Sequence, residues 1–99
     1  MRPKVHRRLA ARLDQLRADS IDLPEQCRNH PEDYALARSL LIDATGLAMK
    51  HSMRALTFDG RGARDDAARE WWEFRRCVRK ATMFHGFARC LTEIKEMTP

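Results

Sequence analysis

Three arginines and one tryptophan in the second half of the chain are spaced so that they share one face of a helix. They follow one another at intervals of three, four and three residues, and helix positions with that spacing are neighbours on the surface. A guanidinium group binds phosphate, and an indole ring offers a nucleic-acid base a surface on which to stack. The pattern indicates a nucleic-acid-binding face composed of Arg69, Trp72, Arg76 and Arg79, flanked by Arg75 and Lys80. The alternative is structural: Trp72 packs under another helix or a partner subunit, and the arginine stems cover it.

A second group of basic residues, Lys4, Arg8 and Arg12, lies near the N-terminus beside an apolar stripe of helical period. Together with the arginine–tryptophan face it would form a continuous positive track. We expect contacts to the phosphates of RNA or DNA, which do not depend on base sequence. A basic amphipathic helix can also lie on a membrane surface. Here the apolar stripe has only four large residues and the rest of the domain to cover, so we expect no membrane partner.

Cysteine and histidine residues are the candidates for a metal site. Cys27 and His30 have the spacing of half a zinc site, and His51 or His85 could complete it. A structural zinc site normally shows two close-spaced ligand pairs, and this sequence has no second pair. His85 also continues an apolar stripe. We therefore expect neither a metal ion nor another cofactor.

Carboxylate pairs are the candidates for acid–base catalysis. Asp65 and Asp66 stand at a predicted helix start, where acidic residues complement the helix dipole. Glu70 and Glu73 are expected to form surface ion pairs with Arg69, Arg76 or other nearby basic residues. We expect no catalytic residues, and predict that the protein is not an enzyme.

Composition places the chain among small globular proteins. It has 99 residues, a net charge of +5 and 43% hydrophobic residues, and arginine supplies fifteen of its nineteen basic residues. No apolar run approaches the roughly 20 residues that span a bilayer. Two of the three cysteines, Cys77 and Cys90, lie in patterns that suggest core positions, so we expect buried free thiols in a reducing compartment. Residues 1–18 contain no apolar signal segment, and although they are amphipathic and Arg-rich like a mitochondrial presequence, they lack Ser and Thr. We expect a cytoplasmic protein.

Periodicity and turn residues predict an all-α fold in one domain, residues 1–99. The predicted elements are a helix over 3–18, an acidic loop over 19–30, a helix over 31–58 and a helix over 63–97, with a bend at Gly86 possible. Pro31 is expected at the first position of the second helix, and the glycines around Arg61 are expected to form the turn between the second and the third helix. The fold is thus a small helical bundle, with a short N-terminal helix and a long antiparallel hairpin.

The predicted second helix is apolar on most sides, and such a helix must be covered on most sides. The short N-terminal helix cannot cover both long helices, so we expect self-association or docking into a larger assembly. The C-terminal half of the third helix carries a further apolar stripe that would serve as the partner interface: Met83, Phe87, Cys90 and Ile94.

These patterns favour a non-catalytic basic accessory subunit that contacts RNA or DNA within a larger ribonucleoprotein-type assembly. At the level of fold alone, and through no sequence motif, a small basic helical bundle resembles the small subunits of CRISPR ribonucleoprotein complexes, which line a nucleic-acid path. The alternative is a protein-only helical interaction module, such as a phage or plasmid inhibitor or regulator, that docks through the apolar stripe.

Overall fold

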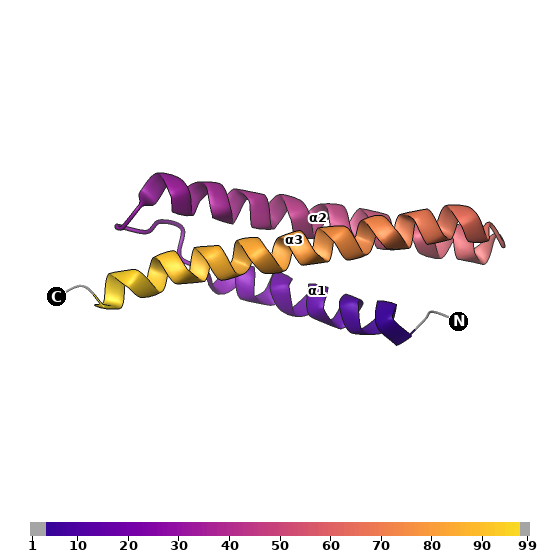
Figure 1. Ribbon diagram of the computed structural model, residues 1–99, viewed down its shortest axis with the longest axis horizontal. Helices are drawn as coiled ribbons and strands as arrows, with labels where there is room; N and C mark the ends of the chain where they lie inside the picture. The colour runs from indigo at the N-terminus through magenta and orange to yellow at the C-terminus, as the bar shows by residue number, and fades with distance from the viewer. Residues whose placement is uncertain (1–3, 98–99) are drawn as a thin grey trace.

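Three α-helices form the molecule, which is described by a computed structural model: α1 (Lys4–Asp22), α2 (Pro31–Gly60) and α3 (Arg64–Met97). The structure describes residues 4–97, and the side chains of residues 6–93. In Figure 1, α1 and α3 run in the same direction and α2 runs antiparallel to both. The prediction of an all-α bundle with a long antiparallel hairpin is confirmed.

The first helix is longer than the sequence suggested. It continues through Asp22 rather than ending near residue 18, so the acidic loop is shorter than predicted. Polar side chains support the extra turn from within the helix: the amide of Gln15 donates to Asp19 at 2.8 Å, and the Ser20 hydroxyl to the Arg17 carbonyl at 2.8 Å. No proline or glycine occurs between Lys4 and Leu23, and Pro24 then disfavours helical geometry in the residue before it.

The loop between α1 and α2 is attached to both long helices. The Tyr34 hydroxyl of α2 donates to the Pro24 carbonyl at 2.5 Å, and the Cys27 thiol lies 3.6 Å from the Leu91 carbonyl of α3. Leu23 and Cys27 are themselves buried. The loop therefore packs against both long helices at this end of the bundle.

The core lies along the line where the three helices meet. On α2 the buried stripe is the one that contains Tyr34, Ala37 and Leu41, whereas apolar residues on either side of it are exposed. On α3 the buried stripe includes Trp71 and Phe74. The other buried apolar residues are Leu13, Leu16, Leu23, Cys27, Ala44, Ala48, Ala55, Ala67, Cys77, Val78, Ala81, Ala88 and Leu91.

The connection from α2 to α3 is a tight turn with Gly62 at a φ of +76°, a conformation that glycine adopts without strain. The turn is held by Asp59, whose carboxylate accepts from the Trp71 indole nitrogen at 3.0 Å. The same indole stacks on the buried His6 ring of α1, with centroids 4.4 Å apart. One tryptophan thus joins all three helices at this end of the bundle.

The molecule is elongated, with extents of 58 × 21 × 16 Å and a radius of gyration of 15.9 Å. A compact domain of this length has a radius of gyration of about 13 Å. The accessible surface is 7087 Å², against about 5,800 Å² for a compact monomeric protein of the same mass. A rod of three helices leaves more apolar surface in contact with water than a compact domain does.

Candidate nucleic-acid interface

The side of α3 that faces away from the other helices is one continuous surface, which we call the α3 outer face. Its residues follow at intervals of three and four, and all of them are exposed. The half nearer the α2–α3 turn is basic and the half nearer the C-terminus is apolar. In order along the helix, the α3 outer face consists of Arg69, Trp72, Arg76, Arg79, Met83, Phe87 and Cys90.

The basic half is centred on an exposed ring. The Trp72 side chain is 58% exposed, and the Arg76 guanidinium carbon lies 5.7 Å from the centre of its ring. This distance is within the range of a cation–π contact. Such a contact holds the guanidinium in place and leaves the rest of the ring open to a ligand.

A shallow hollow of about 250 Å³ lies beside this pair. Its lining is one aromatic ring and four cationic side chains, without a carboxylate: Trp72, Arg75, Arg76, Arg79 and Lys80. The structure thus brings together three of the four residues of the predicted arginine–tryptophan face with both predicted flanking residues. Arg69 lies on the same face, three residues before Trp72 and closer to the α2–α3 connection, and it does not line the hollow.

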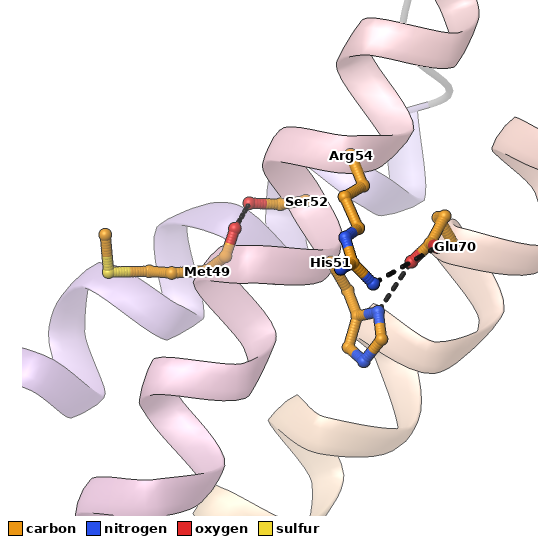
Figure 2. A network of polar contacts seen from close by, with 5 residues as sticks. All are labelled: Met49, His51, Ser52, Arg54 and Glu70. Carbon is orange, nitrogen blue, oxygen red and sulfur yellow. Dashed lines mark hydrogen bonds and ion pairs between the residues drawn. The ribbon is translucent and has the colours of Figure 1, made fainter.

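The position of Glu70 explains part of this positive charge. The sequence led us to expect a surface ion pair between Glu70 and a neighbouring arginine of its own helix. Instead, Glu70 Oε2 lies 2.5 Å from Nδ1 of His51 on α2, and Oε1 lies 4.0 Å from the Arg54 guanidinium (Figure 2). Glu70 is turned toward α2 because its helix position borders the α2–α3 contact, so its charge is directed away from the arginines of the outer face.

None of the basic residues at the hollow has a carboxylate partner. Among the side chains that the structure describes, the ion pairs involve His51, Arg54, His85 and Arg89, and not the four cationic residues that line the hollow. An unpaired guanidinium keeps all its donors available for an oxyanion. The hollow is therefore chemically suited to a phosphate group next to a flat ring.

The basic residues of α1 lie on a separate helix. Arg8 and Arg12 are exposed, and Arg12 is close enough to His85 of α3 to contribute to lowering its pKa. The Lys4 side chain lies outside the described side chains. Because α1 and α3 run in the same direction, the basic N-terminal half of α1 lies alongside the basic half of α3 (Figure 1). The continuous positive track remains a prediction.

The apolar half of the α3 outer face carries the predicted partner-interface residues. Met83 and Phe87 are 62% and 52% exposed, and Cys90 is exposed as well. The Ile94 side chain lies outside the described part of the chain. The expectation that Cys90 is a core thiol is wrong: it lies on the outer stripe, whereas the buried thiols are Cys27 and Cys77.

Cys77 and the possible metal ligands are the remaining reactive side chains among the described residues. Burial raises the pKa of the Cys77 thiol, and the nearby Glu73 raises it further, which favours the protonated form. Within the part of the chain that the structure describes, no three His, Cys, Asp or Glu side chains are close enough to hold a metal ion.

Comparison with known proteins identifies no relative: no family model matches the chain, and neither a curated protein nor a solved structure is significantly similar to it. None of the described helices combines the length and the apolar character that a bilayer crossing requires.

Proposed function

We propose that the protein is a non-catalytic accessory subunit that binds the backbone of RNA or DNA through the basic half of the α3 outer face. The observation that supports this most directly is the exposed Trp72 ring with the Arg76 guanidinium over it, in a hollow lined only by this ring and cationic side chains. The arginines would bind successive phosphates, and the ring would stack on an unpaired base. Because both interactions tolerate any base, binding would depend little on sequence.

The test is the binding of fluorescent single-stranded and duplex oligonucleotides across a salt series. Trp72→Ala should weaken binding to single strands by roughly 5- to 150-fold, the range that corresponds to about 1–3 kcal/mol for loss of one stacked base. Arg76→Ala should weaken binding to both forms and reduce the slope of log affinity against log salt by about one.

Arg89→Ala is the matched control, because Arg89 is an exposed arginine on the same helix whose partner is Glu93, at 3.6 Å. It removes the same charge outside the proposed site. If Trp72→Ala and Arg76→Ala bind like the wild type, or if Arg89→Ala loses as much affinity as Arg76→Ala, the proposed site is wrong.

A second candidate function rests on the exposed Met83 and Phe87. Two large apolar side chains one helical turn apart are typical anchors for docking between helices. In that case the protein is an interaction module such as an inhibitor or regulator. Phe87→Glu would then abolish the complex with the partner protein, and charge reversal at Arg76 would have little effect on it.

A further inference from the structure

The outer side of α2 is a second uncovered surface, which we call the α2 outer stripe. Its residues follow at alternating intervals of three and four, so they share one face of the helix, and all seven are exposed. This face lies opposite the buried stripe that contains Ala37, Leu41 and Ala48. The α2 outer stripe consists of Leu36, Ser39, Asp43, Gly46, Lys50, Met53 and Thr57.

The stripe itself is mostly polar: its large apolar side chains are Leu36 and Met53, and further exposed apolar side chains flank it. Met53 is 64% exposed, Leu47 is 49% exposed, and Ile42 and Leu56 on the other flank are exposed as well. The exposed area of the molecule exceeds that of a compact protein by roughly 1,200 Å², and a stable interface covers about 800 Å² on each partner. The molecule therefore has enough uncovered surface for one standard interface.

We propose that the α2 outer stripe binds the same stripe of a second copy of this chain, with the two α2 helices antiparallel and related by a two-fold axis. The axis passes between Gly46 and Leu47. Closed dimers of this kind use one surface twice, so the surface must be complementary to itself. The stripe meets this requirement in both its charges and its shape.

The charges of the two stripes are complementary in this register, because Asp43 of each copy faces Lys50 of the other. A two-fold axis between positions 46 and 47 places these two residues opposite each other, and symmetry makes the pair twice. They are seven residues apart on one helix, about 10 Å along the axis, too far to pair within one chain. Neither has an ion-pair partner among the described residues. The dimer would therefore satisfy two charges that the single chain leaves unpaired.

The shape is complementary at the centre of the stripe. A Cβ added to Gly46 would meet no atom within 4 Å, so the helix surface is open there. The axis places the exposed Leu47 of the second copy over this open position, as a side-chain knob over a gap. Further outward, the same register places Leu36 of each copy opposite Thr57 of the other, near the two ends of the stripe.

This dimer does not depend on the proposed nucleic-acid function. It covers α2 and leaves the α3 outer face of each copy uncovered, because the two faces belong to different helices and both point away from the core. A dimer would present two basic surfaces rather than one.

The first test is a charge exchange measured by sedimentation equilibrium. The wild type should form dimers, whereas Asp43→Lys and Lys50→Asp should each weaken dimerisation by roughly tenfold or more, because each creates two like-charge contacts. The double variant, Asp43→Lys with Lys50→Asp, should restore it. Asp14→Lys, which makes the same charge change at an exposed position of α1, should have no such effect. A monomeric wild type, or single variants that dimerise like the wild type, would overturn the proposal.

The second test uses disulfide formation in a Cys90→Ser background. Leu47→Cys should form a disulfide-linked dimer, because the axis brings the two copies of this position together. Thr57→Cys should not, because the two copies of Thr57 would lie about 30 Å apart in antiparallel helices at 1.5 Å per residue. Cross-linking of Thr57→Cys as fast as Leu47→Cys would indicate a parallel pair and contradict the two-fold arrangement. Helical circular dichroism confirms that each variant is folded.

Discussion

Two adjacent tryptophans in α3 have opposite environments, and this contrast decides what each does. Trp71 is buried, stacks on His6 and donates to Asp59, whereas Trp72 is mostly exposed and contacts Arg76. Neighbouring helix residues point about 100° apart, so one can lie in the core while the next lies outside. The first is a structural residue and the second is available to a ligand.

Alanine substitutions should separate the two roles. Trp71→Ala should lower the free energy of unfolding by about 3–5 kcal/mol, the usual cost of removing a large buried aromatic side chain. Trp72→Ala should lower it by about 1 kcal/mol or less, as expected at an exposed position. Urea denaturation followed by circular dichroism measures both. Equal losses for the two variants would contradict the assigned burial.

His85 should make the protein less stable in mild acid. Burial lowers its pKa below the ordinary value of 6.5, and Arg89 and Arg12 lower it further, against the opposing effect of Asp19, 3.8 Å from Nε2. Because the unfolded chain binds this proton more tightly than the folded protein, the contribution of His85 is complete above pH 6.5 and declines as the pH falls below it. His85→Gln removes the titrating group, so its unfolding free energy should fall less between pH 7 and pH 5 than that of the wild type. Parallel curves would show that His85 does not carry the effect.

At the scale of the helices, the same substitution should have opposite effects at two glycines. Gly62 has a positive φ in the α2–α3 turn, and an added side chain there is strained by about 1–2 kcal/mol. Gly86 lies inside the continuous helix α3, with open space around its Cβ position, so alanine there should stabilise by about 0.5–1 kcal/mol. Thermal unfolding should therefore show a lower Tm for Gly62→Ala and a higher one for Gly86→Ala. A higher Tm for both would contradict the turn geometry.

The helices could be predicted largely from periodicity and turn residues, because these are local signals. Pro31 and the glycines around Arg61 marked the limits of α2 to within about two residues. The end of α1 was placed too early, because the run of acidic residues after Asp19 resembles a loop, although its first members belong to the helix. Charge alone does not end a helix; the nearest residue that does so by its backbone is Pro24.

Contacts between helices could not be predicted, because they join residues far apart in the sequence. The pairing of Glu70 with His51, rather than with its arginine neighbours, depends on how α2 and α3 face each other. The exposure of Cys90 could not be predicted for the same reason. Its apolar stripe has the spacing of a core stripe, and only the packing of the helices shows that none of them covers it. The arginine–tryptophan face was recognisable, because all its residues lie on one helix.

At the scale of the molecule, the two uncovered surfaces have different chemistry and belong to different helices. The basic half of the α3 outer face suits an anionic polymer, and the α2 outer stripe suits a second copy of the chain. Asp19 and Asp22 lie away from the basic half: they line a hollow with Arg89, beyond Lys80 along α3. A rod with separate surfaces can bind two partners at once without either blocking the other.

The dimension that distinguishes a side-by-side dimer from other assemblies is the radius of gyration, which small-angle X-ray scattering measures. For a single chain it is 15.9 Å, and the Asp43→Lys variant should give a value close to this. Two rods that pair along α2 have centres about 20 Å apart, given helix diameters of about 10 Å, so the wild-type dimer should give about 19 Å. An end-to-end dimer of rods 58 Å long would exceed about 30 Å, since half the separation of the two centres adds in quadrature to the radius of gyration of one rod. A wild-type value above 30 Å, or one equal to that of Asp43→Lys, would show that α2 is not where the copies meet.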